Sequence, residues 1–136
     1  MKYEYLEHTA DIKFRAYGKN IEEAFTNAAY ALTNIMTDNT KVQKKLRRHI
    51  KVDAQDEKSM LYDFLETFLV LFDSEEFILA KVEHIKINGN RLSAEVIGDN
   101  ELADYDIDTH IKAITYQEME IIKEKDKVTI QVIPDL

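Results

Sequence analysis

The sequence contains no cysteine, one proline and three glycines in 136 residues. Without cysteine there are no disulfide bonds, thiolate zinc sites or cysteine nucleophiles. So few glycines and prolines exclude collagen-like, flexible-linker and low-complexity disordered chains. The sequence also lacks an apolar run long enough to span a membrane, and it begins without the apolar segment of a secretory signal. We therefore expect a globular protein of the cytoplasm.

The charge balance is acidic, with 18 Lys and Arg against 26 Asp and Glu and a formal net charge of −8. This balance disfavours general attraction to nucleic-acid phosphates. A basic run from Lys41 to Lys51 is the local exception. We interpret it as the outer face of a strand, because it has no interleaved aromatic residues for base stacking. Direct RNA contact is therefore expected to be weak or absent, and a protein or a cation is the more plausible partner.

Hydrophobic periodicity predicts two helices. The first runs from about Ile21 to Met36, with Asn20 as its N-cap and Glu23 three residues later. The second begins after Asp56-Glu57 and ends near Asp73-Ser74, and its apolar residues recur at helical spacing. Strands are predicted at Tyr3 to His8, Ile12 to Gly18, Val42 to Val52, on both sides of Asn88-Gly89, at Ile111 to Ile122 and at Lys127 to Ile133.

The element order is β-β-α-β-α-β-β-β-β, without a regular alternation of strand and helix. It predicts an α+β fold, a two-layer sandwich with two helices on one face of a mostly antiparallel sheet. The turn at Asn88-Gly89 predicts a type I′ hairpin that pairs Ile87 with Asn90 and Ile85 with Leu92. At 136 residues with 45% hydrophobic content, the chain is expected to form a single domain over residues 1–136.

Several common active-site patterns fail in this sequence. The run Asp104-x-Asp106-x-Asp108 matches the first half of a calcium-binding EF-hand loop, but Thr109 and Thr115 stand where Gly and Glu are required. We interpret the acidic stretch from Asp99 to Asp108 as a solvated loop. The four histidines lack metal-helix spacing, and there is no glycine-rich phosphate loop or G-x-S-x-G motif. A self-contained nucleotide-hydrolysing or hydrolase site is therefore disfavoured.

Two carboxylates flank strands at opposite ends of the chain. Asp11 directly precedes the predicted strand at Ile12, and Asp135 follows the strand that ends at Ile133. If these strands are antiparallel neighbours, the two side chains meet at one sheet edge. A terminal oxygen of Leu136 would complete a set of hard oxygen ligands for Mg²⁺ or Ca²⁺. The alternative, two ordinary exposed acids, stays open because spacing does not establish which strands are neighbours.

Three segments resemble, in order, the signature segments of the archease family. They are Glu7-His8-Thr9-Ala10-Asp11-Ile12, Ile111-Lys112-Ala113-Ile114-Thr115-Tyr116 and Val132-Ile133-Pro134-Asp135-Leu136. The resemblance spans the whole chain, and the three segments together are far more specific than any one of them. Two positions depart from the pattern: Gln117 stands where many relatives have histidine, and Lys13 stands where a small residue is common.

The resemblance implies a protein cofactor that is not itself an enzyme. Archease proteins act as accessory proteins of RtcB-type tRNA-splicing ligases, which join RNA ends using GTP and a divalent metal. They promote guanylylation of the ligase's own histidine and so allow multiple turnovers in tRNA splicing and RNA repair. A second proposed family role is that of a chaperone-like modulator of a tRNA cytosine methyltransferase. A small metal-dependent hydrolase ranks below both, because two acids without an evident general base make a poor self-sufficient site.

Carried over residue by residue, the family's metal ligands fall on Asp11 and Asp135, with Leu136 supplying a terminal oxygen to Ca²⁺ or Mg²⁺. The functional lysine of the family falls on Lys112, whose other interpretation is an exposed strand lysine. An ammonium beside a carboxylate and metal cluster balances charge or reaches a GTP phosphate. His8 lies within the first segment, and it is either a hydrogen-bonding partner of a ligand or a structural histidine.

Overall fold

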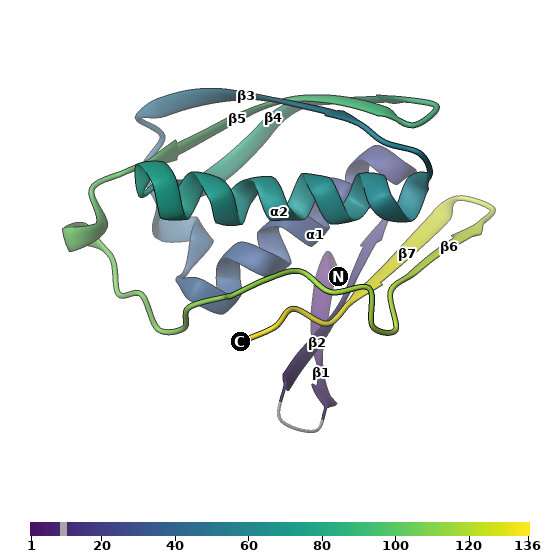
Figure 1. Cartoon of the computed structure of the whole chain (residues 1–136), viewed down its shortest axis with the longest axis horizontal. Coiled ribbons are helices and arrows are strands. Elements are labelled where there is room, and N and C mark those ends of the chain that lie inside the picture. The colour runs from purple at the N-terminus through teal and green to yellow at the C-terminus, as the bar shows by residue number, and fades with distance from the viewer. Residues whose placement is uncertain (9–10) are drawn as a thin grey trace.

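The computed structural model describes residues 1–8 and 11–136. Thr9 and Ala10, which belong to the first signature segment, lie outside the described residues. The elements, in chain order, are β1 (Tyr3–His8), β2 (Asp11–Gly18), α1 (Ile21–Met36), the short 3₁₀ turn η1 (Asn39–Lys41), β3 (Leu46–Asp53), α2 (Glu57–Glu75), β4 (Ile78–Asn88), β5 (Arg91–Asp99), the 3₁₀ turn η2 (Leu102–Asp104), β6 (Glu120–Glu124) and β7 (Lys127–Val132). The predicted order of seven strands and two helices is confirmed (Figure 1).

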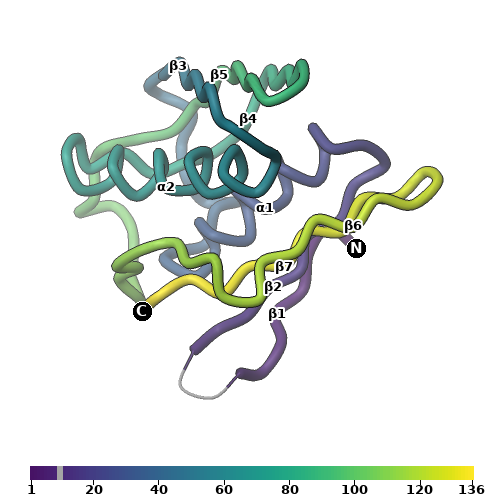
Figure 2. The backbone as a smooth tube through the Cα atoms, turned by 45° about the vertical axis from the view of Figure 1, so that its right-hand side comes forward, coloured from purple at the N-terminus to yellow at the C-terminus, as the bar shows by residue number. Residues whose placement is uncertain are grey.

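The strands form two antiparallel sheets rather than the single sheet that we predicted. The first has the order β1-β2-β7-β6 and the second the order β3-β5-β4. Both helices lie between the two sheets, as Figures 1 and 2 show. Helix α1 contacts β2 and β7 of the first sheet and β4 of the second. The α+β class is confirmed, but each sheet covers a different side of the helical layer.

The composition of α1 explains why one sheet is not enough to cover it. Its buried residues include four alanines and extend around most of the helix, and a helix that is apolar on more than one side must be covered on each. The small alanines also allow close approach of the neighbouring elements. Rings of Phe25 from α1 and Phe64 from α2 pack between the sheets with their centroids 5.8 Å apart. Both phenylalanines are fully buried.

The two helix starts follow their capping residues. The Asn20 side chain accepts a hydrogen bond from the Glu23 backbone N–H, so the predicted N-cap of α1 is confirmed. Asp56 caps α2 in the same way by accepting from the N–H of Ser59, whose hydroxyl in turn accepts from the Asp56 N–H. Helix α2 ends where Glu76 adopts a left-handed conformation with φ of 58°. Neither helix is long and apolar enough over its described residues to cross a membrane.

The hairpin between β4 and β5 has a different register from the predicted one. Asn88 pairs with Arg91 and Ile87 with Leu92, so the two loop residues are Gly89 and Asn90. Gly89 has φ of 60° and Asn90 has no positive φ, the pattern of a type II′ turn with glycine first. Ile87 thus pairs with Leu92 instead of Asn90, two residues further along β5. An even displacement keeps every side chain on the same face of the sheet. The apolar residues Ile85, Ile87 and Leu92 therefore stay on one face of the hairpin, where they belong to or pack against the hydrophobic core.

The predicted strand from Ile111 to Ile122 is wrong over most of its length. Only Glu120–Glu124 forms a strand, β6, and it pairs with β7 around a turn at Lys125-Asp126. A turn at Gln117-Glu118 interrupts the segment, and Glu118 lies in the left-handed region with φ of 52°. Residues 111–119 instead form an extended segment, called here the 111–119 segment. In Figure 1 it runs below α2 and beside the C-terminal residues.

Candidate functional site

The candidate metal ligands Asp11 and Asp135 lie at the same end of the first sheet. Strand β2 pairs antiparallel with β7, and Phe14 is opposite Val132. Asp11 is three residues before Phe14 and Asp135 is three residues after Val132, so both extend from the same end of this strand pair. The premise that these strands are antiparallel neighbours is therefore confirmed. Asp11 is the first residue of β2, whereas we predicted it just outside the strand.

The 111–119 segment brings Lys112 to this end of the sheet. The Lys112 N–H donates to the carbonyl of Asp135 at 2.8 Å, and the Asp135 N–H donates to the carbonyl of Ala113 at 2.8 Å. The hydroxyl of Thr115 donates to the Ile133 carbonyl at 2.6 Å. Two of the three signature segments therefore lie side by side through main-chain bonds, although their sequence positions are about twenty residues apart.

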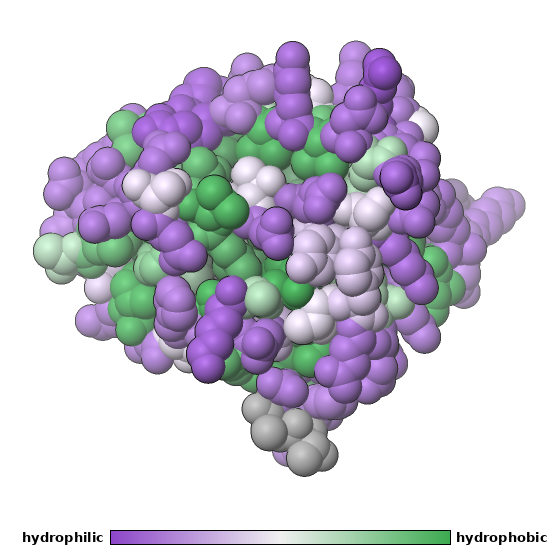
Figure 3. All heavy atoms as spheres, in the orientation of Figure 1, coloured by the Kyte–Doolittle hydropathy of each residue, from purple (hydrophilic) through white to green (hydrophobic). Residues whose placement is uncertain are grey.

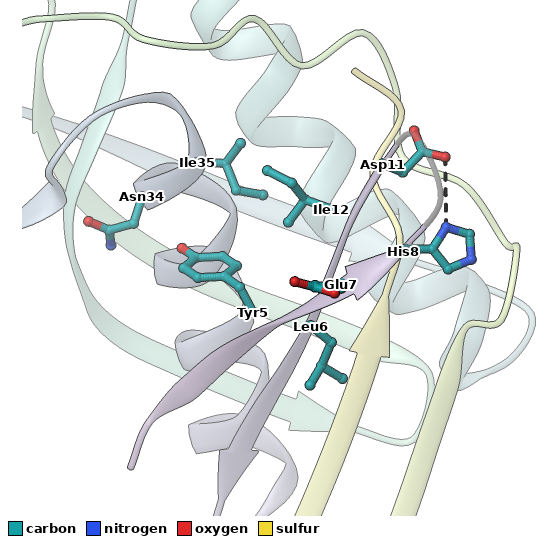
Figure 4. A pocket seen from close by; sticks show the side chains of 8 residues that line it. All are labelled: Tyr5, Leu6, Glu7, His8, Asp11, Ile12, Asn34 and Ile35. Carbon is teal, nitrogen blue, oxygen red and sulfur yellow. Dashed lines mark ion pairs between the residues drawn. The ribbon is translucent and has the colours of Figure 1, made fainter.

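The Asp11 carboxylate faces the imidazole of His8. Figure 4 shows the two side chains converging from neighbouring strands, with Nδ1 of His8 4.0 Å from Oδ2 of Asp11. This distance is too long for a direct hydrogen bond. His8 Nδ1 is nevertheless buried, and it has no hydrogen-bond partner among residues 1–8 and 11–136. A buried polar atom without a partner costs free energy, so the gap beside Asp11 suits a bridging polar group such as a bound water.

The side chains at this end do not by themselves complete a cation site. Asp11 is partly exposed and Asp135 is exposed. Within residues 1–8 and 11–136, no group of three His, Asp or Glu side chains is close enough to hold a metal ion. A cation here would need the terminal oxygens of Leu136, water or groups from a partner in addition to the two aspartates. Such mixed oxygen sets are usual for Mg²⁺ and Ca²⁺.

A cluster of three charged or polar side chains, which the sequence did not reveal, connects His8 to the 111–119 segment. Nε2 of His8 is 3.0 Å from Oε2 of Glu118, and Nζ of Lys13 is 3.4 Å from Oε1 of Glu118. These two partners lower the pKa of the Glu118 carboxyl. No local pattern marks Glu118, because it lies more than a hundred residues from both partners. Lys13, which directly follows the first signature segment and departs from the family pattern, therefore has an ion-pair partner in Glu118.

The backbone of Glu118 is held from the opposite direction. Its carbonyl accepts a hydrogen bond from Nε2 of the Gln131 side chain at 2.9 Å, and Oε1 of the same side chain accepts from Arg15 Nε at 2.9 Å. Gln131 belongs to β7 and is buried. The turn that carries Glu118 is thus anchored to β1, β2 and β7. Gln117, the departure from the family pattern, is exposed, and its backbone N–H donates to the Thr115 hydroxyl.

An open pocket with a volume of about 900 Å³ lies against the N-terminal hairpin. His8 and Asp11 lie at one end of it, Ile12 lies in the middle, and Ile35 lies toward the other end, near Asn34 (Figure 4). Tyr5 lines the pocket beside Ile35, and its hydroxyl donates to the Ala31 carbonyl at 2.8 Å. Because the pocket is open, it is suited to part of a partner molecule rather than to an enclosed small substrate.

The two charged stretches have mainly structural contacts. In the basic run, Arg47 pairs with Glu83 and Glu95 at 2.9 and 3.1 Å, and Arg48 pairs with Glu75 at 2.7 Å. These pairs neutralise two cations of the run. Strand β3 begins at Leu46, so the interpretation as a solvated strand face is confirmed for Arg47 to Lys51 and wrong for Lys41 to Lys45, which precede the strand. In the acidic stretch, the carboxylate of Asp99 is buried, so this part of the stretch is not the solvated loop that we predicted.

Asp99 is stabilised as a carboxylate within the fold. The hydroxyl of Tyr105 donates to its Oδ2 at 2.5 Å, and the N–H groups of Asn100 and Glu101 donate to its Oδ1 at 2.8 and 3.3 Å. Burial alone would raise the pKa of Asp99, but these hydrogen bonds outweigh it and the pKa is lowered. Tyr105 also accepts from the Gln43 N–H at 3.0 Å. Asp99 therefore organises the loop after β5.

Comparisons with known proteins agree over nearly the whole chain. Residues 3–136 match the model of the Archease protein family. The chain is 39% identical to the archease of Methanosarcina barkeri over 99% of this chain and 96% of that protein. It is 42% identical to the archease of Sulfurisphaera tokodaii over 88% of each.

Two solved structures are similar to the fold described above. The solution structure of protein 1598 from Methanobacterium thermoautotrophicum has a TM-score of 0.84 and 31% identity, and 99% of each chain is covered. The crystal structure of an archease from Thermotoga maritima, described as a possible chaperone, has a TM-score of 0.64 and 21% identity, with 96% of this chain and 94% of that chain covered. The second comparison supports the fold alone.

Proposed function

Because the chain belongs to the archease family, we propose that it is an accessory protein of an RtcB-type tRNA-splicing ligase. In this role it promotes the GTP-dependent guanylylation of the ligase and multiple turnover in tRNA splicing and RNA repair. It is a protein cofactor and not itself an enzyme. The observation that carries the proposal is the meeting of Asp11, Lys112 and Asp135, which come from three signature segments, at one end of the first sheet.

The exposed position of this site favours work on a partner. Lys112 and Asp135 are exposed, and Asp11 lines an open pocket. A site of this kind lacks the enclosure that excludes water from a reacting substrate. It does allow its side chains to enter another protein's active site, as an activating residue supplied in trans does in phosphoryl transfer.

A divalent cation, Ca²⁺ or Mg²⁺, fits the donor set of Asp11, Asp135 and Leu136. All the donors are hard oxygens, and Nδ1 of His8 beside Asp11, which no described residue partners, suits a water held at the site. When bound, such a cation supplies positive charge next to phosphate oxygens. Asp11 and Asp135 hold it, and the backbone bonds between Asp135 and the 111–119 segment fix the position of Asp135.

Lys112 contributes a positive charge that does not depend on a bound cation. Guanylylation places a triphosphate in the ligase site and releases pyrophosphate, so negative charge must be balanced in the transition state. An ammonium on a flexible side chain reaches phosphate oxygens as a point charge. The N–H of Lys112 is bonded to Asp135, so its backbone is fixed while its exposed side chain stays free to reach outward.

The direct test follows the transfer of labelled GMP from GTP to the purified ligase. We expect the native chain to stimulate transfer and the variants Asp11→Ala, Asp135→Ala and Lys112→Ala to lose stimulation while their circular dichroism stays native. Asp104→Ala and Lys86→Ala, at exposed positions outside the site, are matched controls and should stimulate fully. Full stimulation by all three folded site variants would contradict the proposal.

The second candidate is a chaperone-like modulator of a tRNA cytosine methyltransferase, favoured by the description of the Thermotoga maritima relative as a possible chaperone. It predicts methyltransferase binding that survives Asp11→Ala. Capture of purified methyltransferase by immobilised native and Asp11→Ala protein therefore separates the two functions. Hydrolysis of a phosphoester by this chain alone would instead revive the metal-dependent hydrolase, which lacks an evident general base here.

A further inference from the structure

Two tyrosines from distant parts of the chain stack on the surface. The rings of Tyr62 in α2 and Tyr116 in the 111–119 segment have centroids 4.5 Å apart and planes inclined by 12°. Tyr116 is 53% exposed, so much of its side chain is open to solvent. Figure 3 shows this face of the molecule, where apolar and weakly polar side chains over α2 are bordered by strongly hydrophilic ones. Exposed, stacked aromatic rings are typical of contact surfaces.

The helix extends this patch along one face. Tyr62, Glu66 and Val70 follow one another at intervals of four residues, which places them on the same side of α2. Val70 is 54% exposed, among the most exposed large apolar residues of the described chain. The stacked rings therefore continue into an exposed stripe that contains a carboxylate and an apolar side chain. We call Tyr62, Tyr116, Asp63, Glu66 and Val70 the tyrosine patch.

The Tyr116 ring is fixed in position before any partner arrives. The backbone N–H of Met119 donates to the Tyr116 carbonyl at 3.1 Å, and the N–H of Gln117 donates to the Thr115 hydroxyl at 3.3 Å. The same hydroxyl donates to the carbonyl of Ile133. A tyrosine has only two side-chain torsions, so a stacked ring on a held backbone loses little entropy on binding.

The charges around the rings are predominantly negative. Partial burial, followed by the charges of Asp63, Asp56 and Glu66 among other causes, raises the pKa of Tyr116. Burial and the carboxylates of Glu66 and Asp63 raise the pKa of Tyr62 as well. Two lysines lie nearby along the chain, Lys58 one helical turn before Tyr62 and Lys112 four residues before Tyr116, against the three acids named above. The field at the rings therefore selects a positively charged occupant.

Stacked tyrosines suit either a nucleic-acid base or the flat face of a guanidinium group. A nucleic acid would bring its phosphates against these carboxylates on a chain of net charge −8, whereas arginine gains from both the rings and the acids. We propose that the tyrosine patch is a docking surface for an arginine-bearing cationic segment of a partner protein. Arginine side chains stack on Tyr116, and the acids of α2 bind their guanidinium groups.

The tyrosine patch is close to the candidate metal and lysine site. Tyr116 is four residues from Lys112, so their Cα atoms are at most about 14 Å apart. A partner segment seated on the rings therefore reaches the end of the first sheet. If the proposed function is correct, on which this step rests, the tyrosine patch supplies affinity for the ligase while Asp11 and Lys112 act on guanylylation.

A first experiment tests the docking surface without the ligase. A peptide of four Gly-Arg repeats, with blocked termini, is titrated into the protein while NMR follows the ring protons of Tyr62 and Tyr116. We expect saturable shifts that weaken as salt rises, and about tenfold weaker binding after Tyr116→Ala. Tyr116→Phe keeps the ring and should bind normally. Equal binding of a Gly-Glu peptide, or ring shifts absent with the Gly-Arg peptide, would overturn the proposal.

A second experiment measures ligase affinity by calorimetry for native protein, Tyr116→Ala and the double variant Asp63→Asn with Glu66→Gln. We expect about tenfold loss in each patch variant, with GMP transfer recovered at saturating concentration. Ile122→Ala and Glu101→Gln, exposed and outside the tyrosine patch, are the controls. Ligase binding that the patch variants leave unchanged overturns the docking surface. A native chain that binds the peptide but not the ligase instead overturns the proposed function and leaves the docking surface standing.

Discussion

His8 and Glu118 form a contact of 3.0 Å between imidazole Nε2 and carboxylate Oε2, although 110 residues separate them in the sequence. The contact joins the N-terminal hairpin to the turn of the 111–119 segment. Lys13 reaches the other oxygen of the same carboxylate. The cluster of His8, Lys13 and Glu118 includes none of the proposed metal ligands. It fixes the N-terminal hairpin, which carries Asp11, relative to the 111–119 segment, which carries Lys112.

Acid should weaken the contacts of the Glu118 carboxylate with His8 and Lys13 in the N-terminal hairpin. His8 and Lys13 lower its pKa from the ordinary value of 4.5, so the charged form is favoured in the folded state. The stabilisation is thus fully present above pH 4.5 and is lost as pH falls through the lowered value. The protection factors of the β1 and β2 amides near His8, which allow for the pH dependence of intrinsic exchange, should fall below that range. Glu118→Gln should show the lower protection already at pH 7, and a variant with native protection would contradict the role of the carboxylate.

Removing one hydroxyl should weaken the loop that follows β5. Tyr105→Phe deprives the buried Asp99 carboxylate of its 2.5 Å donor, and loss of a hydrogen bond to a charged group costs about 2 kcal/mol. The lowered pKa of Asp99 stabilises the fold above about pH 3.8 and loses this effect as pH falls. Urea denaturation should therefore show a smaller stability difference between native protein and variant at pH 3 than at pH 7. Tyr17→Phe, whose hydroxyl contacts the partly exposed Glu4, is the control.

Gly98 is expected to tolerate no side chain. A Cβ at this position would lie 1.9 Å from the Ile78 carbonyl oxygen and 2.8 Å from the Phe77 ring. The strand pair would have to separate, so Gly98→Ala should destabilise the protein by about 3 kcal/mol in thermal or urea denaturation. In Gly89→Ala the added methyl group meets open space. Its loss of stability should be only the cost of a left-handed backbone at a residue other than glycine, about 1 kcal/mol. A cost at Gly98 no larger than at Gly89 would show that the strands adjust freely.

Sequence patterns predicted the elements that depend on local chemistry. Asn20 begins α1 where its side chain caps the Glu23 N–H, and Met36 ends the helix as its apolar periodicity stops. The predictions that were wrong depend on contacts between residues that are far apart in the sequence. The division into two sheets depends on which strands cover α1, and the turn at Glu118 depends on Gln131 and His8. Neither relationship leaves a local pattern in the chain.

In the candidate site, too, the sequence predicted individual residues but not the contacts between distant segments. Asp11 and Asp135 were predicted from their places beside strands that proved to be neighbours. The approach of Lys112 to Asp135 runs through main-chain bonds of a segment that was predicted as a regular strand, so the sequence indicated the residue but not its contact. The stack of Tyr62 on Tyr116 was not foreseen, because residues on a helix and a loop share no periodicity.

Divalent cations should stabilise the native protein through Asp11 and Asp135. A cation that binds only the folded state raises its stability, by about 2.7 kcal/mol when its concentration is a hundred times the dissociation constant. We therefore expect millimolar CaCl₂ or MgCl₂ to raise the melting temperature of the native chain and to have no such effect on Asp11→Asn or Asp135→Asn. Asp104→Asn, at an exposed acid in η2, should respond as the native chain does. Equal cation responses in all four proteins would place any binding elsewhere and leave the two aspartates as surface acids at the end of the sheet.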